Sequence, residues 1–327
     1  MSAPGSLVIS LDFELHWGMH DKWTVEEYKA NLDGARAAID GTLSLFERYQ
    51  IRATWATVGI LFCDGRGDAL AHAPTQKPAY DRPNLDPYPL LARCGDDEAA
   101  DPLHFAPSVV ARIASADGQE IGTHTYSHYY ALEHGQTSDQ FAADIASACM
   151  VAERAGVTLS SIVFPRNQVC REYLDVCRKA GIVAYRPNRE TWMQTPRPSR
   201  DESRFRRALR LTDTYLPLEG DVVRPSIDPS GVVAVPSSRQ LRPVGTRRSP
   251  LEDLLQRRIL AGMRQAATTG AVYHLWWHPH NFGAAVGRNL EQLEVILKHH
   301  ASLRARHGMR SESMGDVGHR TLAEGAR

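Results

Sequence analysis

Residues 7–15 read LVISLDFEL, and this stretch decides the fold class. Apolar residues occupy every odd position from Leu7 to Leu15, while Asp12 and Glu14 occupy even positions. Because successive side chains of a strand point to opposite faces, the alternation predicts a strand with one apolar face and one face that carries two carboxylates. The apolar face can pack under helices, and the two acids would face something polar.

Helical and strand-like segments alternate downstream of this strand. A helical pattern covers residues 25–49, and a short β-rich segment follows at 52–58. Further helices and strands alternate over 107–185, and a helix, a strand and a second helix follow between 251 and 305. Such alternation predicts βαβ units and therefore a mainly parallel sheet or barrel in an α/β protein.

Three segments depart from the alternation. Residues 61–105 are rich in Pro, Asp and Gly, which predicts a long structured loop inserted after the second strand. We expect this insertion to roof the functional site, with a contact between copies of the chain, in a homo-oligomer, as the alternative. Residues 187–250 are dense in Arg, Pro and Ser and allow no assignment beyond a strand near 231–235. Residues 1–306 then form one domain, and the polar residues 307–327 are expected to be a flexible tail.

Composition excludes several classes of function. The 327 residues include 38 basic and 38 acidic side chains, and this balance argues against a protein that wraps nucleic acid. No apolar run reaches the length of a membrane-spanning helix, and the first residues do not resemble a signal peptide. Five cysteines without a CxxC pair argue against a disulfide framework and favour a reducing, cytoplasmic location.

Clusters of chemically active residues fall at the predicted strand ends. Asp12 and Glu14 lie two apart on one strand face, and residues 124–128 read HTYSH. Two histidines four residues apart can converge on one cation, and imidazole is a common ligand of zinc and related metals. Incidental surface acids and histidines are the alternative for each cluster taken alone.

A third cluster, YHLWWHPHN at residues 273–281, ends a predicted strand. Pro279 should stop this strand and leave His278 at its C-terminal tip, which is where catalytic groups gather in parallel barrels. His274 lies deeper on the same face and fits a hydrogen-bonded core histidine. Taken together, the three clusters are typical of a hydrolytic metal site with a separate acid/base pair.

The clusters resemble motifs of the polysaccharide deacetylase family, the NodB-homology carbohydrate esterases. SLDFE at residues 10–14 occupies the place of the family's paired acids, HTYSH at 124–128 matches its histidine motif, and LWWH at 275–278 matches its late motif. Residues 53–59 resemble the family's second strand, so the resemblance runs from about residue 7 to residue 280. It implies a distorted (β/α) barrel of the NodB type, one divalent metal ion, and removal of N- or O-acyl groups from sugars.

The resemblance also implies roles for individual residues. Glu14, His124 and His128 would hold the metal, although DFE replaces the family's adjacent aspartates and leaves the roles of Asp12 and Glu14 exchangeable. Asp12 would act as the general base and His278 as the acid that protonates the leaving amine. The family's Arg-Pro-Pro-aromatic motif appears as FPRNQ at residues 164–168, so that Arg166 would orient the base. Three further residues are expected to bind substrate: Tyr126, Trp277 and His280.

These residues predict a metal-dependent hydrolase that removes an N-acyl group, expected to be acetyl, from a sugar during polysaccharide biosynthesis. Zinc is the expected ion, with Co, Ni, Mn or Fe as alternatives. The alternatives for the activity are a metal-free amidase of the same fold acting on a cyclic ureide or small amide, a non-haem iron oxygenase, and an inactive sugar-binding relative. The expected partner is an N-acylated sugar, with no nucleic acid and no membrane span.

Overall fold

The computed structural model describes residues 3–189 and 220–326, and its sheet is built around the first strand, β1 (Ser6–Phe13). All eight residues of β1 are buried. Its odd-numbered apolar residues lie in the main hydrophobic core, whereas Val8 packs in a separate cluster on the other face. The alternation read from the sequence is therefore the alternation of the folded strand.

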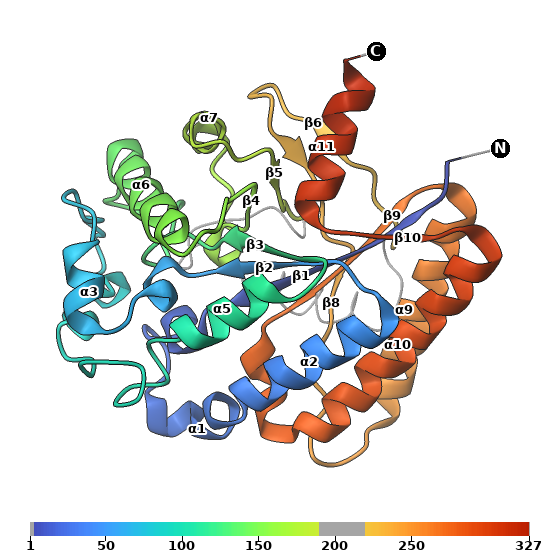
Figure 1. Cartoon of the computed structure of the whole chain (residues 1–327), viewed down its shortest axis with the longest axis horizontal. Helices are drawn as coiled ribbons and strands as arrows, with labels where there is room; N and C mark the ends of the chain where they lie inside the picture. The colour runs from blue at the N-terminus through green and yellow to red at the C-terminus, as the bar shows by residue number, and fades with distance from the viewer. Residues whose placement is uncertain (1–2, 190–219, 327) are drawn as a thin grey trace.

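The remaining strands form one sheet, in which β1 lies between β2 and β9 (Figure 1). The strand order is β6-β7-β5-β4-β3-β2-β1-β9-β8, and every pair along this path is parallel except β6–β7. Their bounds are Ala53–Thr57 (β2), Gln119–Thr123 (β3), Ser161–Ile162 (β4), Ala184–Tyr185 (β5), Ser226–Ile227 (β6), Val233–Ala234 (β7), Arg239–Gln240 (β8) and Val272–Trp277 (β9).

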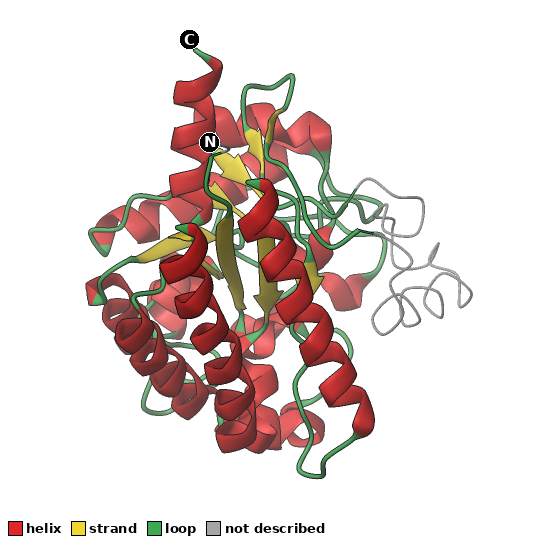
Figure 2. Cartoon of the chain, turned by 90° about the vertical axis from the view of Figure 1, so that its right-hand side faces the viewer, coloured by secondary structure: helices red, strands yellow, loops and turns green. Residues whose placement is uncertain are grey.

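Helices cover the outside of the curved sheet (Figures 1 and 2). In Figure 1, α2 lies beside α10, although α2 comes from the N-terminal part of the chain and α10 from the C-terminal part. Helix α10 also packs against α9. This arrangement confirms the predicted distorted (β/α) barrel. The helices are α1 (Val25–Asp33), α2 (Ala35–Tyr49), α3 (Arg66–Ala71), α4 (Tyr88–Leu91), α5 (Pro107–Ser115), α6 (Ser138–Arg154), α7 (Leu174–Lys179), α9 (Pro250–Thr269), α10 (Val286–His307) and α11 (Met314–Gly325).

Short 3₁₀ turns connect several of these elements. The turn η1 (Leu15–Gly18) follows β1, and η7 (Pro279–Ala285) follows β9 at the proline predicted to stop that strand. The other turns are η2 (Gly59–Phe62), η3 (Pro83–Leu85), η4 (Pro165–Asn167) and η5 (Arg171–Tyr173). Within the described ranges, no helix is long and apolar enough to cross a membrane.

The expected single helix at 25–49 is two helices that separate at Gly34. A Cβ at Gly34 would collide with the backbone of Gly283, so the break coincides with a close approach between α2 and η7. The strand expected near 231–235 is β7. The rest of the segment 187–250 carries β6 and β8, except that residues 190–219 lie outside the described residues.

The prediction of a flexible tail at 307–327 is wrong. Arg310–Glu312 form strand β10, which pairs in parallel with Ser6–Val8 of β1. Ser313 then caps α11, whose Met314 and Val317 are buried against the sheet. The polar composition suggested disorder because this segment has few apolar residues, but those few face the sheet. Strand β10 pairs with residues 6–8 of β1, which precede the residues that pair with β2.

Candidate active site

Chemically active side chains gather at the carboxyl ends of the parallel strands. Glu14 directly follows β1, His124 directly follows β3, and His278 directly follows β9. In parallel barrels this edge collects the loops after every strand, so residues distant in the sequence meet there. The three sequence clusters therefore form one site, as the strand pattern predicted.

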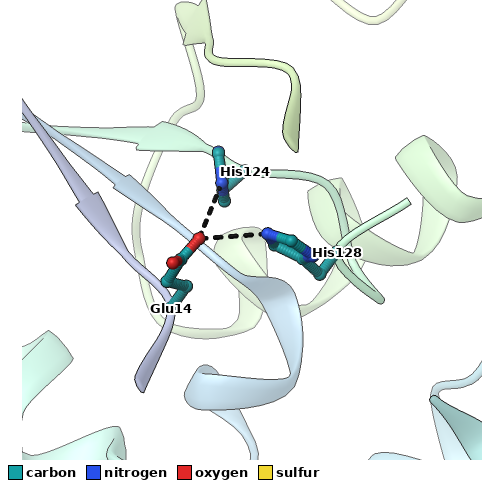
Figure 3. Close-up of side chains that lie close together, drawn as sticks. All are labelled: Glu14, His124 and His128. Carbon is teal, nitrogen blue, oxygen red and sulfur yellow. Dashed lines mark hydrogen bonds and ion pairs between the residues drawn. The ribbon is translucent and has the colours of Figure 1, made fainter. Parts of the chain in front are cut away.

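Glu14, His124 and His128 converge on one point (Figure 3). Oε2 of Glu14 lies 3.0 Å from Nε2 of His128 and 3.2 Å from Nε2 of His124. Ligand atoms held about 2.1 Å from a tetrahedral ion are roughly 3.4 Å apart, so these separations are close to those of a metal ligand set. All three side chains are almost completely buried.

Hydrogen bonding around His124 supports a cation at this point. Its Nδ1 lies 2.8 Å from the backbone carbonyl oxygen of Val163, which can only accept, so Nδ1 carries the proton. Nε2 is then the ring nitrogen that faces the carboxylate of Glu14. A hydrogen bond from the far ring nitrogen orients metal-binding histidines in this way, and the arrangement leaves Nε2 available to a cation.

Burial keeps the ligands in the required charge states. Burial lowers the pKa of His128 to about 4, although Glu14 opposes this shift, so the imidazole is neutral near pH 7. Burial alone would raise the pKa of Glu14, but the nearby His278 and the hydrogen bonds from His124 and His128 hold it well below its ordinary value. A neutral imidazole and an ionised carboxylate are the forms that coordinate metals.

The loop that carries the two histidines is held by a buried carboxylate. Thr125 and His128 both adopt positive φ, at 65° and 57°, which is a strained conformation for these residue types. Asp144 on α6 accepts hydrogen bonds from the backbone N–H groups of Tyr126 and Ser127 and from the Ser127 hydroxyl. These bonds fix the turn that brings His128 back beside His124.

Gly18 makes room for the Glu14 carboxylate. A Cβ at residue 18 would overlap the carboxylate atoms of Glu14, so any larger residue would displace the proposed ligand. The turn η1 thus packs directly against the ligand set.

Asp12 lies beside this set and is bound by Arg186. The two Nη atoms of Arg186 donate to the two carboxylate oxygens of Asp12 at 2.7 and 2.8 Å. Arg186 also donates to Ser10 Oγ at 2.9 Å and to Asn167 Oδ1 at 2.9 Å. Burial would raise the pKa of Asp12, but the charge of Arg186 outweighs it together with smaller contributions from nearby histidines, so the pKa is lowered and the carboxylate stays ionised.

His274, which lies deeper on β9 than His278, hydrogen-bonds to the same network, as the sequence predicted. Its Nε2 lies 2.8 Å from Ser10 Oγ, and its Nδ1 donates to the carbonyl oxygen of Val235 at 3.0 Å. Burial lowers the pKa of His274 to about 3, so the ring is a neutral acceptor for the Ser10 hydroxyl. His274 is therefore a hydrogen-bonded core histidine.

His278 occupies the opposite side of the site from His124. Its Nε2 lies 3.4 Å from Glu14 Oε1 and 3.7 Å from Asp12 Oδ2, and its side chain is 22% exposed. His280 lies beside it but is buried, which lowers its pKa to about 3. Among the described residues, Nδ1 of His280 has no hydrogen-bond partner.

A pocket of about 280 Å³ opens over these groups. Its floor contains Asp12, Glu14 and His128, and its sides come from η1 and the residues after it, from the β4–α7 loop, and from the end of β9 with η7. The remaining lining residues are Gly18, Met19, Lys22, Trp23, Tyr28, Arg166, Asn167, Trp276, His278, His280 and Asn281. No described residue of the insertion 61–105 lines the pocket, so the insertion does not form the expected roof, and four residues of 18–23 form one side of the pocket.

Three residues make other contacts than the roles expected from the sequence require. Arg166 lines the pocket but pairs with Asp21 at 2.5 and 2.6 Å, and the arginine that orients Asp12 is Arg186. Trp277 is fully buried and stacks on Phe282, because its side chain points to the opposite face of β9 from His278. Tyr126 is fully buried, and its hydroxyl donates to the carbonyl oxygen of Ala69.

Sequence reasoning missed Arg186 and Trp276. Arg186 follows the short strand β5 and precedes Pro187, so it stands at a strand end like the other active groups, but only tertiary pairing across the sheet reveals its partner. Trp276 could have been found by alternation, since it shares a face with His278. In the structure the guanidinium of Arg186 lies 4.3 Å from the ring centroid of Trp276.

The fold and site together define a parallel-stranded α/β barrel with a convergent Glu-His-His cluster and a separate carboxylate and histidine, the class of site found in hydrolases. A model of the polysaccharide deacetylase family matches residues 33–185. This match confirms the resemblance that the motifs carry, and it indicates a hydrolase that acts on amide bonds. The matched range includes His124 and His128, whereas Asp12, Glu14 and His278 lie outside it.

Solved structures share the fold at low identity. A protein from Mycobacterium smegmatis classed as a polysaccharide deacetylase aligns over 99% of this chain and 95% of its own, with 12% identity and a TM-score of 0.61. A deacetylase-class protein from Pseudomonas aeruginosa PAO1 aligns over 98% and 90%, with 12% identity and a TM-score of 0.56. The PuuE allantoinase aligns over 97% and 89%, with 13% identity and a TM-score of 0.56. A search of curated protein sequences finds no match.

Proposed function

We propose that this protein is a metal-dependent deacylase that removes an N-acyl group from a small sugar. The observation that carries the proposal is the convergence of Glu14, His124 and His128 at the floor of a pocket that also contains Asp12 and His278. A ligand set, an ionised carboxylate and a further histidine within a few ångströms supply the groups that amide hydrolysis needs.

The donor set fits a divalent ion. Two imidazole nitrogens and one carboxylate oxygen approach one another at ligand–ligand distances, and a carbonyl fixes the tautomer of His124. A divalent ion bound there would supply Lewis acidity to the acyl oxygen and to water. The same donor set supports the metal-dependent proposal over the metal-free alternative, because Nε2 of both histidines and the Glu14 carboxylate meet at one point.

The residues of the chain itself supply proton transfer. Asp12, ionised and held by both Nη atoms of Arg186, accepts a proton from the attacking water. His278 donates a proton to the departing amine nitrogen, because an amine leaves poorly unless it is protonated. Its partial exposure at the pocket rim allows it to recover a proton from solvent after each turnover.

A second candidate is hydrolysis of a small amide or cyclic ureide. The volume of the pocket favours it, since about 280 Å³ is at the low end for small-molecule sites and matches a monosaccharide or a smaller amide. The fold shared with the PuuE allantoinase is compatible with this candidate.

The decisive experiment compares substrates and metals together. Purified protein, stripped of metal and reloaded with Zn²⁺, Co²⁺, Ni²⁺, Mn²⁺ or Fe²⁺, is assayed for acetate release from N-acetylated monosaccharides and sugar nucleotides and for ring opening of cyclic ureides. We expect chelator-sensitive acetate release. Ring opening that survives the chelator would replace the proposal by the metal-free alternative, and consumption of O₂ would replace it by an oxygenase.

Three finer parts of the proposal rest on the sequence. They are the choice of zinc, a role in polysaccharide biosynthesis, and a cytoplasmic location. Cytoplasmic location is supported by the five cysteines, all of which are free thiols, as expected in a reducing compartment.

A further inference from the structure

A second buried cluster of histidines lies beside the pocket, between the insertion and the turn after β1. Nδ1 of His104 lies 2.7 Å from Asp101 Oδ1, Nε2 of His104 lies 2.9 Å from Nδ1 of His16, and Nε2 of His16 lies 2.9 Å from the carbonyl oxygen of Trp23. His16 and His104 are both buried. The three contacts form one linear chain from the insertion to Trp23.

Trp23 is part of the pocket wall, which we define as residues 18–23. Four residues of this wall line the pocket, and Trp23 itself is 50% exposed. The wall begins where η1 ends, and η1 packs against the insertion through the Trp17 indole N–H, which donates to the carbonyl oxygen of His104 at 2.8 Å. The wall therefore rests on the insertion through His104.

Counting protons along the chain shows what holds it together. Its three contacts need three protons, because the oxygens of ionised Asp101 and of Trp23 can only accept at the two ends. Two neutral imidazoles provide only two N–H protons, so one ring must carry an additional proton. Burial would raise the pKa of Asp101, but the hydrogen bonds from His104 and from the Gly95 N–H outweigh it and lower that pKa, so the carboxylate is ionised. The additional proton is held by the histidine pair, which adjoins that carboxylate through the 2.7 Å contact of His104.

We propose that Asp101, His104 and His16 are positioning residues, and that their chain of three hydrogen bonds, completed by one additional proton on the histidine pair, holds the pocket wall in the geometry that binds substrate. The 2.7 Å contact between Asp101 and His104 has the length of a charge-assisted hydrogen bond. Cys94 lies close to Asp101 and His104, but both nitrogens of His104 and both oxygens of Asp101 already have hydrogen-bond partners, so the cluster is a structural chain rather than a metal site.

Asp101 variants test the chain most directly. Asp101→Ala removes the end of the chain, whereas Asp101→Asn can accept from the Gly95 N–H and donate to Nδ1 of a neutral His104. His104 would then donate to His16, and His16 to Trp23, so all three contacts survive with one proton fewer. We therefore expect Asp101→Ala to loosen the wall and Asp101→Asn to preserve it.

The same logic applies to His104. Glutamine offers one donor and one acceptor at about the spacing of the two ring nitrogens, so His104→Gln can fill two contacts of the chain but never all three. We expect His104→Gln to fall between wild type and His104→Ala. His72→Ala is the matched control, because His72 bonds Asp68 within the same insertion and does not line the pocket.

Hydrogen exchange of amides 16–24 in the metal-loaded protein measures the wall independently of the proposed function. Exchange should rise about three- to tenfold in His104→Ala and Asp101→Ala, the change that loss of one hydrogen bond produces, and should stay at the wild-type value in Asp101→Asn and His72→Ala. Ring ¹⁵N spectra should show three N–H protons on His16 and His104 in wild type and two in Asp101→Asn. Unchanged exchange in both alanine variants, or an equal rise in His72→Ala, would overturn the proposal.

The kinetic part of the experiment, which measures KM and kcat of the variants, rests on the proposed function. We expect KM to rise by about the same factor as exchange in the alanine variants, with kcat nearly unchanged. A rise in exchange without any deacylation in wild type would refute the proposed activity and leave the positioning chain intact. Deacylation with unchanged KM in both alanine variants would instead refute the positioning role.

Discussion

Among the described residues, two clusters of carboxylate and histidine differ in the direction of their contacts. In the first, Nε2 of His124 and Nε2 of His128 point at the same oxygen of Glu14. In the second, Asp101, His104 and His16 follow one another in a line that ends on a carbonyl oxygen. The first cluster reaches the pocket floor, while the second lies behind the pocket wall.

The difference shows that residue type alone does not define a metal site. A convergent cluster directs several potential ligand atoms at one point, where a divalent cation can be bound. A linear cluster uses each atom once and can be completed by a single proton. The two clusters differ in the direction of their contacts and in whether each polar atom already has a hydrogen-bond partner, and not in the number of histidines.

Removing one ligand from the convergent cluster should have the largest effect. We expect His128→Ala to lose the divalent ion and to lower deacylation by at least about 10³-fold, because the ion supplies several kcal/mol of transition-state stabilisation. His104→Ala, in the linear cluster, should keep full metal content. Metal analysis of both variants checks this, and full occupancy in His128→Ala would show that the convergent cluster is not the ligand set.

Asp12, beside the convergent cluster, should affect the catalytic rate but not the binding of the metal. Asp12→Asn should retain the ion and lose about 10²–10⁴-fold in kcat, the usual contribution of a general base. Glu14→Ala should instead weaken metal binding. The opposite pattern, measured by metal titration and kcat, would exchange the roles of the two acids.

Removal of Arg186 should move the pH profile. Its positive charge lowers the pKa of Asp12, so Arg186→Met should raise that pKa and shift the acidic limb of kcat/KM to higher pH. Arg224→Met, a change of an exposed arginine that donates to the carbonyl oxygen of Thr269 and does not line the pocket, serves as the control. An acidic limb that stays in place would mean that it reports a group other than Asp12.

Substitutions of His278 and His280, the two histidines that follow β9, should have different effects on the kinetic constants. His278→Ala should lower kcat by about 10²-fold while binding metal normally, since loss of a general acid has effects of that size. His280→Ala should mainly raise KM by a few fold, because His280 lines the pocket and its Nδ1 has no hydrogen-bond partner among the described residues. Equal losses of kcat in both variants would make His280 the acid.

Buried neutral histidines should give a smaller effect on stability. The pKa of His274 is about 3 in the folded protein, against an ordinary value near 6.5, so the unfolded chain binds a proton that the folded chain does not. The free energy of unfolding should therefore fall as pH decreases below 6.5, by up to about 1.4 kcal/mol per pH unit for this residue. His274→Gln should reduce that slope in urea titrations of metal-free protein between pH 6.5 and 5, and an unchanged slope would refute the assignment.

Local pattern was sufficient for much of the fold and for the cluster of Glu14, His124 and His128. The alternation over residues 7–15 placed Asp12 and Glu14 on one face, and the spacing of His124 and His128 allowed them to converge. Pro279 marked the end of β9 and so placed His278. In each case one strand and its end determine where the side chain lies.

Features that depend on distant segments were not predictable in the same way. Asp12 is paired with Arg186 because β5 lies in the same sheet as β1, four strands away, and nothing near residue 166 reveals that its own partner is Asp21. The substrate role given to Trp277 failed for a different reason. Alternation from His278 already directs it to the core side of β9, where it packs on Phe282.

The pairing of β10 with β1 also bears on how the chain acquires its fold during synthesis. Ser6 to Val8 are synthesised long before residues 310–312, their partners on one side. Contacts between segments so far apart in the sequence form slowly, because a large loop must close before they contribute. The edge of β1 that β10 covers thus stays open until residues 310–312 have been synthesised, and we expect chaperones to bind, and aggregation to begin, at this nascent edge.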